Sequence, residues 1–326
     1  MTSVNRHDQV LINSKYTLVV CLIGIIMMSA TYKAHANVTG ATYVNNLSNF
    51  NGLIHYNRPN IYLDKETNEM YVLDKREGNI SIFDKGGMEI YSFGEDGSLG
   101  TLDDLVVDTY GNIILLSRMG RKPVILFCNY RGELISEIKF KNLPPEFSGF
   151  EPHRMDYRKG RLYFADIKDM KVVVTDTNGL FEDGYDIASL LSIEEKKKAD
   201  IELDGFSVGR KGDIFFTIPV YFAVFRLSPD GQIRGFGEKG GAPGKFNIVG
   251  GVVTDDSGNI FVADKLKSAI LVFDKDFNFQ IEFGYRGLLL PRNLIGPNEL
   301  AIASDGRLYV AQKRSRGVSV FQITYN

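Results

Sequence analysis

The sequence contains four side chains that can bind a metal ion or transfer a proton and that stand near the beginnings of apolar, strand-like segments: Asp103, His153, Asp204 and Glu299. Arg58 occupies a similar place near the first such segment. Three carboxylates that meet at one point supply the hard oxygen ligands that calcium prefers, and an imidazole can join them. These residues are therefore candidates for a metal-assisted catalytic site. The alternative is a group of polar side chains that water satisfies.

Histidine and cysteine limit this chemistry. The chain has four histidines, at positions 7, 35, 55 and 153, and only two of them follow residue 36. Cys128 ends the apolar segment 124–128, a pattern that predicts a buried and unreactive thiol. No second cysteine follows residue 36, so an internal disulfide is not expected there. The Cys-x-x-Cys-His motif that attaches haem is absent, and no cofactor is predicted apart from the candidate calcium ion.

A second set of side chains is basic and occupies short loops between apolar segments. Its members are Lys75, Arg76, Arg118, Arg121, Lys122, Lys265, Lys267, Lys313, Arg314 and Arg316. Other turns of the chain are acidic, for example at Asp108 and Asp274, so the net charge of −2 conceals a polarity. A basic face favours an anionic partner. The alternative is that these lysines and arginines only solubilise exposed loops.

Asp74, Asp166 and Asp264 each end an apolar segment and invite a catalytic interpretation. A carboxylate that recurs at equivalent positions is explained more simply as a turn cap that accepts hydrogen bonds from backbone N–H groups. We therefore predict a structural role for these three residues.

Six apolar segments recur along the chain and must position all of these side chains. They are 70–74, 113–117, 162–166, 214–218, 260–264 and 308–312. Successive copies end 43, 49, 52, 46 and 48 residues apart. A period of this size with about four strands per unit predicts a β-propeller. Glycine precedes the strand in five copies and Thr67-Asn68 in the first, and such residues accept the positive φ of a tight turn. In a propeller the first strands line a central channel, and their starting ends, near Arg58, Asp103, His153, Asp204 and Glu299, meet at one mouth.

The repeat resembles the NHL repeat. The residues that carry the resemblance are Gly-Asn-Ile-Phe-Val-Ala-Asp at 258–264, Ile-Leu-Val-Phe-Asp at 270–274, Phe-Gly at 283–284, and the linker 236–247. The resemblance covers residues 55–323 and is weakest in the fourth unit, where Pro219 follows the strand. It implies an all-β, six-bladed propeller with four-stranded antiparallel blades, in agreement with the independent count of six.

The resemblance also bears on function. Propeller lyases of similar type, which cleave amidated peptide precursors, use several histidines around a channel zinc, and His55 and His153 are too few for that pattern. Exported relatives occur in bacteria rich in multihaem cytochromes, so the resemblance makes an electron-transfer assembly one class of partner.

Two further features of the fold can be predicted. The last unit ends after its third strand, 317–323, and the strand-like segment 41–47 precedes the first unit. We expect this N-terminal strand to close the last blade, because an open edge would expose unpaired backbone groups. Residues 187–200 lack β-branched alternation and predict a short helical insertion between blades 3 and 4, with Leu190, Leu191 and Ile193 on its apolar face.

The first 36 residues have the features of a secretory signal peptide. Arg6 and Lys15 form a basic flank, the apolar run 18–28 is too short to span a bilayer, and Ala34-His35-Ala36 provides small residues for cleavage. The alternative is an uncleaved N-terminal anchor. The prediction divides the chain into a signal, 1–36, and a propeller domain, 37–326, without a transmembrane span after cleavage.

The sequence therefore predicts an exported, monomeric propeller in the periplasm or outside the cell. Its expected function is protein binding or scaffolding through the basic loops, with another exported protein or an anionic envelope component as partner. Nucleic acid is not expected, because the protein is exported and no aromatic residues alternate with the basic ones. The alternative is a lyase or hydrolase with a metal-assisted site at the channel mouth.

Overall fold

The computed structural model describes residues 36–56, 59–120, 122–198, 200–287, 289–313 and 316–326. Nearly all of the predicted signal, 1–36, lies outside the described residues. Residues Asn37–Asn326 form one compact unit. Within the described part of the chain, no helix is long and apolar enough to cross a membrane.

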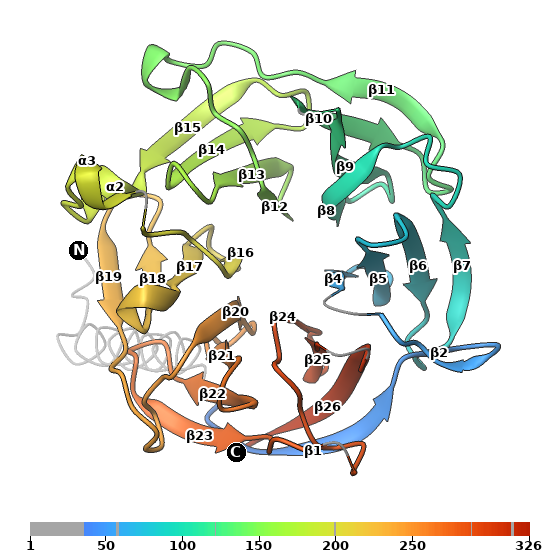
Figure 1. The fold of residues 1–326 in the computed structure, drawn as a ribbon, viewed down its shortest axis with the longest axis vertical. Coiled ribbons are helices and arrows are strands. Elements are labelled where there is room, and N and C mark those ends of the chain that lie inside the picture. Colours follow the sequence, from blue (N-terminus) through green and yellow to red (C-terminus); the bar gives the residue numbers. More distant parts are fainter. Residues whose placement is uncertain (1–35, 57–58, 121, 199, 288, 314–315) are drawn as a thin grey trace, which may run out of the picture. The chain divides into compact units, whose positions relative to one another are not determined.

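The unit Asn37–Asn326 is a six-bladed β-propeller, as predicted (Figure 1). Blade 1 contains β4 (Asn60–Asp64), β5 (Glu69–Asp74), β6 (Asn79–Phe83) and β7 (Glu89–Phe93); blade 2 contains β8 (Thr101–Val107), β9 (Ile113–Met119), β10 (Lys122–Cys128) and β11 (Leu134–Ile138); blade 3 contains β12 (Arg154–Arg158), β13 (Arg161–Asp166), β14 (Lys171–Asp176) and β15 (Phe181–Asp186). Blade 4 contains β16 (Phe206–Val208), β17 (Ile214–Ile218), β18 (Ala223–Leu227) and β19 (Ile233–Phe236); blade 5 contains β20 (Val249–Thr254), β21 (Ile260–Asp264), β22 (Ala269–Phe273) and β23 (Phe279–Phe283); blade 6 contains β24 (Glu299–Ile302), β25 (Arg307–Ala311), β26 (Val318–Tyr325) and β1 (Val38–Asn46).

The ring closes as the sequence predicts. The N-terminal strand β1 pairs antiparallel with β26 and supplies the outer strand of blade 6, with Tyr43 opposite Phe321. A two-stranded hairpin, β2 (Ser48–Asn49) and β3 (Gly52–Leu53), then leads into blade 1. Strand β24 contacts β4, so the innermost strands of blades 6 and 1 complete the circle.

Six clusters of buried apolar side chains hold the ring together, one at each contact between neighbouring blades. Strand β21 shows why its sequence is apolar throughout. Phe261 and Ala263 pack toward blade 6, whereas Ile260 and Val262 pack toward blade 4. Both faces of the strand are therefore buried. Successive side chains point in turn to one neighbouring blade and to the other, and neither set faces solvent.

The connections use the predicted turn chemistry. The Asp264 carboxylate accepts hydrogen bonds from the N–H groups of Leu266 and Lys267 in its own blade, and from Asn247 in the connection from blade 4. Asp74 and Asp166 accept equivalent bonds at the ends of β5 and β13. Gly258 has a φ of +89°, and Asn68 takes the corresponding role in blade 1 with a φ of +60°. The structural interpretation of the repeated aspartates is thus confirmed.

The insertion between blades 3 and 4 is helical, as predicted, but it contains two single-turn helices, α2 (Ile187–Leu190) and α3 (Glu195–Lys198). Asp186 caps α2 by accepting a hydrogen bond from the Ser189 N–H. The expected apolar face is only partly correct, because Leu190 is exposed while Leu191 and Ile193 pack on the core. Two short 3-10 helices, Pro145–Phe147 and Pro219–Tyr221, lie in other loops.

Cys128 is buried at the end of β10, as expected. Burial raises the pKa of its thiol to about 11, so the thiol is protonated at neutral pH.

Candidate functional site

One arginine connects opposite sides of the central channel. Arg154 begins β12 in blade 3, and its Nη2 lies 2.5 Å from Glu299 Oε1, at the start of β24 in blade 6. Blades 3 and 6 are opposite in the ring, as Figure 1 shows. The Nη1 of Arg154 donates a second hydrogen bond to Asn60 Oδ1 in blade 1, at 3.2 Å. A single side chain therefore joins three blades.

Asn60 and Asp104 extend this connection around the channel. The Nδ2 of Asn60 donates to the Asp103 carbonyl and to Asp104 Oδ1 in blade 2, at 2.9 and 3.0 Å. Asp104 Oδ2 in turn accepts a hydrogen bond from the Met155 N–H in blade 3, at 3.0 Å. We call Asn60, Asp104, Arg154 and Glu299 the crossing network.

Burial perturbs the ionisation of the crossing network. Burial opposes the charge of Arg154, but Glu299, Asp104 and Asp204 outweigh it, and together they raise the pKa of the guanidinium. Burial raises the pKa of Glu299, against the opposing effect of Arg154. The pKa of the nearby Lys75 is lowered by burial and by the charge of Arg154. The charge of Arg154 and the charge of Glu299 therefore stabilise each other, and loss of either would leave the other buried and uncompensated.

Each of the three carboxylates proposed as metal ligands forms an ion pair with a different cation. Asp103 pairs with Arg118 Nε at 2.6 Å, Glu299 pairs with Arg154, and Asp204 pairs with Lys265. The Nδ1 of His153 lies 3.5 Å from a different carboxylate, Asp166 Oδ1. Arg58 lies outside the described residues. In the part of the chain that the structure describes, no three His, Cys, Asp or Glu side chains gather in a metal-binding group.

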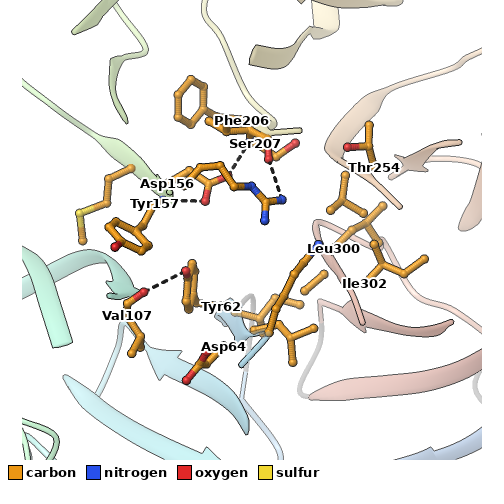
Figure 2. A pocket seen from close by; sticks show the side chains of 18 of the residues that line it. Tyr62, Asp64, Val107, Asp156, Tyr157, Phe206, Ser207, Thr254, Leu300 and Ile302 are labelled. Atoms are coloured by element: carbon orange, nitrogen blue, oxygen red, sulfur yellow. Dashed lines mark hydrogen bonds between the residues drawn. The ribbon is translucent and has the colours of Figure 1, made fainter. Parts of the chain in front are cut away.

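A cavity of about 440 Å³ occupies the channel on one side of the crossing network. Residues from the first-to-second-strand turns of all six blades line it, including Lys65, Thr109, Lys159, Arg210, Asp256 and Ser304. Figure 2 shows Asp156 and Tyr157 on one side and Leu300 and Ile302 on the other. The Tyr62 hydroxyl donates to the Val107 carbonyl at 3.2 Å. We call the end of the ring formed by these turns the turn face.

Most polar side chains of this cavity, other than Glu299, were not predicted as site residues. Arg154, Asp156 and Arg158 alternate with Met155 and Tyr157 along β12. Because strand side chains alternate in direction, this period of two places the three charged residues on the channel face. The alternation of charged and apolar residues in 154–158 is the sequence signal that could have identified Arg154, Asp156 and Arg158. Asp156 accepts from the Val208 N–H at 2.6 Å, and burial raises the pKa of its carboxyl.

The predicted basic residues lie in the second-to-third-strand loops, which we call the loop face together with the blade-to-blade connections. Several of them serve the fold. Lys265 pairs with Asp204, and the side chain of Lys267, only 8% exposed, pairs with Glu282 at 2.9 Å. Arg118 pairs with Asp103. Arg316 donates to the carbonyls of Leu290, Pro291 and Asn293.

Two other members of the basic set, Arg76 and Lys122, are exposed, and Arg76 pairs with its neighbour Glu77. Lys75 is accessible to solvent, but Arg154, Asp104 and Glu299 of the crossing network act on its charge, and burial lowers its pKa. Lys313 is half-buried. Arg121 and Arg314 lie outside the described residues.

The loop face also exposes large apolar side chains. Leu289 is 94% exposed, Tyr285 is 77% exposed and Leu266 is 51% exposed. These loops are tied to one another: the Lys265 N–H donates to the Ile248 carbonyl, and the Gly296 N–H donates to Ser268 Oγ. The exposed apolar side chains carried by the loop-face loops and connections of blades 4 to 6, which we call the apolar patch, are Val220, Tyr221, Ile248, Leu266, Tyr285, Leu289 and Leu290.

The connections that carry the apolar patch also carry exposed cations. Arg286 and Arg292 are exposed within the same connection that carries Leu289. Lys239 is exposed in the preceding connection, and its Nζ lies 5.0 Å from the centre of the Phe222 ring. These connections therefore present exposed apolar side chains and exposed cations together, with Glu238 as an exposed acid beside Lys239.

Comparison with known proteins supports the architecture. No family model matches the sequence, and no curated protein matches it. Among solved structures, the chain is similar to a streptogramin B lyase, with a TM-score of 0.57, 15% identity, and coverage of 87% of this chain and 98% of that one. It is also similar to a protein of unknown function from Bacteroides thetaiotaomicron (TM-score 0.61, 13% identity, 88% and 75% coverage). A putative gluconolactonase is a third similar structure (TM-score 0.58, 12% identity, 90% and 95% coverage). At these identities the likeness establishes the fold alone.

Proposed function

We propose that this protein is an exported binding module of NHL type that contacts an acidic protein partner through its loop face. The observation that carries the proposal is the apolar patch, in which Leu289 is 94% and Tyr285 77% exposed on a connection that Arg316 anchors through the Leu290 and Pro291 carbonyls. Monomeric proteins rarely leave large apolar side chains grouped in this way unless the group contacts a partner. An apolar centre with a polar border is the usual composition of a protein interface.

The charges around the patch favour an acidic protein. Lys239, Arg286 and Arg292 lie in the same connections as the patch, and Arg76 and Lys122 add positive charge elsewhere on the loop face. An anionic polysaccharide would use the charges but would leave the apolar centre without a contact. A protein surface with an apolar core and acidic border matches both features.

Affinity capture from the exported protein fraction of the native host tests this proposal. The variant L266S/Y285S/L289S removes the apolar centre, and F50S/L53S/Y110S removes comparably exposed side chains elsewhere on the ring. We expect the wild type and the F50S/L53S/Y110S control to retain the same acidic protein and the patch variant to lose it. Retention of the same proteins by all three would contradict the proposal.

A metal-assisted lyase or hydrolase site is the alternative function. The structurally similar streptogramin B lyase and putative gluconolactonase bear the names of enzymes. The alternative has weaker support because Asp103, Asp204 and Glu299 each already have a cationic partner. Elemental analysis of the purified protein tests it: stoichiometric calcium or zinc would favour the enzyme over the binding module.

Export itself is part of the proposal and has a simple test. Cleavage after Ala36 would leave Asn37 at the N-terminus, directly before β1. We expect N-terminal sequencing of the protein recovered from outside the cytoplasm to begin at Asn37. Recovery of the intact chain from the membrane fraction would instead indicate an uncleaved anchor.

A further inference from the structure

The channel cavity lies at the end of the ring away from the loop face, and nothing in the proposed interface uses it. The crossing network forms its inner boundary: Asn60, Asp104, Arg154 and Glu299 line the cavity, whereas Lys75, Asp204 and Lys265 on the other side do not. At its outer end the cavity reaches the six turns of the turn face. Its volume of about 440 Å³ falls within the range of small-molecule sites.

Two cations in this cavity have unused hydrogen-bonding capacity. Arg158 donates from Nη2 to the Val208 carbonyl at 3.2 Å, but its buried Nε has no acceptor. Lys65 lines the same cavity, and its ammonium makes no hydrogen bond or ion pair with the described residues. A buried N–H without a partner costs free energy, so both groups would gain from an acceptor that enters the cavity.

Lys65 and Arg158 act on each other. Both side chains line the same cavity, and burial, followed by the charge of Arg158, lowers the pKa of Lys65. The carboxylates of Asp256, Asp156 and Asp255 act on Lys65 in the opposite sense but do not outweigh the effects that lower its pKa. An anion in direct contact with both cations would stabilise their charged forms.

The carboxylates of the cavity wall are mostly occupied by the protein itself. Asp64 accepts from the Glu66 N–H and the Thr67 hydroxyl, at 2.9 and 2.8 Å. Asp156 accepts from the Tyr157 and Val208 N–H groups, at 2.7 and 2.6 Å. Asp108 accepts from two N–H groups of its own turn. Glu66 and Asp256 are exposed at the outer rim. These acids therefore leave the Arg158 Nε and the Lys65 ammonium without a direct acceptor.

Apolar side chains complete the cavity. Tyr62, Leu300 and Ile302 lie along its walls (Figure 2). We propose that this end of the channel binds a small organic anion, a carboxylate or phosphate ester, whose charged group contacts Lys65 and Arg158 and whose apolar part contacts Tyr62, Leu300 and Ile302. A purely inorganic anion would use the cations but leave the apolar walls without a contact.

Isothermal titration calorimetry with the purified 37–326 protein tests the proposal. The probes are benzoate, phenyl phosphate, inorganic phosphate and the neutral benzyl alcohol. We expect benzoate or phenyl phosphate to bind at least tenfold more tightly than both inorganic phosphate and benzyl alcohol. Equal affinity for phenyl phosphate and inorganic phosphate would refute an organic ligand, and failure of both aryl anions to bind would refute the site.

Two variants locate the binding. Lys65→Gln removes one cation without breaking a hydrogen bond, so the fold should persist, and we expect at least a tenfold loss of affinity for the aryl anion. Lys211→Gln is the matched control, because Lys211 is exposed in the β16–β17 turn and does not line the cavity. An equal loss in both variants would overturn the proposal, since it would reflect only the general charge of the turn face. Arg158→Gln should also weaken binding, with circular dichroism used to confirm that the loss of its bond to Val208 leaves the ring folded.

Discussion

Arg154 shows how much of the ring depends on one side chain. It contacts blade 6 through Glu299 and blade 1 through Asn60, and its side chain and that of Glu299 are only 16% and 15% exposed. Removal of one member of a buried ion pair leaves the other charge without compensation. The pair therefore contributes to stability only while both partners are present.

The first prediction concerns this pair. Arg154→Met should lower the free energy of unfolding by about 3 kcal/mol or more, and R154M/E299L should lower it by less, because both charges are then removed. Urea denaturation followed by circular dichroism measures the effect, since the chain has no tryptophan. Arg76→Met is the control: its ion pair with Glu77 is exposed, with side chains 86% and 64% accessible, and should contribute less than about 1 kcal/mol. A double variant as unstable as R154M alone would contradict this account.

The second prediction concerns acid stability through Asp166. Burial tends to raise its pKa, but the nearby His153 and hydrogen bonds from the Asp169 and Glu151 N–H groups outweigh it, so the folded pKa lies below the ordinary value of 3.8. A lowered pKa means that its stabilisation is present above that value and is lost as the pH falls through the folded pKa. Asp166→Asn should cost about 1–3 kcal/mol at pH 7 and lose less stability than the wild type between pH 5 and pH 2. Asp169→Asn, an exposed neighbour, should retain the wild-type pH profile; an identical profile for D166N would refute the role of Asp166.

The strands could be predicted from the sequence because each carries its signal locally. The segment 260–264 is apolar at every position, and the glycine at 258 provides the positive φ of its turn. The closing strand was also predictable, because the last unit lacks an outer strand and 41–47 can supply it. The insertion at 187–200 was less well predicted, since the turn at Leu191–Ser192 divides what its composition indicates as one helix.

The third prediction tests the closing strand. A chain that begins at Ser48 would lack β1 and would expose the edge of β26 and the apolar side chains of Phe321 and Ile323. We expect it to melt at a lower temperature and to aggregate, because an unpaired edge strand can pair with another chain. Addition of a synthetic peptide of residues 37–47 should restore monomeric behaviour in light scattering. A monomer of unchanged melting temperature without the peptide would contradict the proposed closure.

The site was harder to predict than the ring, because its geometry depends on pairing between distant blades. The sequence placed Asp103, Asp204 and Glu299 near one mouth of the channel, but it could not show that Arg118, Lys265 and Arg154 would each neutralise one of them. For the same reason Lys265 and Lys267, expected on a free basic surface, are engaged within the protein. Long cationic side chains can reach either solvent or a neighbouring carboxylate, and only the folded ring determines which.

The propeller as a whole has two ends with different chemistry. The loop face combines Leu266, Tyr285 and Leu289 with basic residues, whereas the turn face surrounds a polar cavity. Between them the crossing network spans the channel, and β1 completes the outer edge of blade 6. We infer that a partner on the loop face and a small anion in the cavity would bind independently, because the network separates the two ends.

Hydrogen–deuterium exchange of the propeller with and without its captured partner tests the central claim most directly. We predict that the partner slows exchange in the loop-face segments 265–268 and 284–287, and leaves the turns at 108–112 and 255–259 unchanged. Protection confined to the turns, with the loop segments unaffected, would contradict the assignment of the loop face as the binding surface.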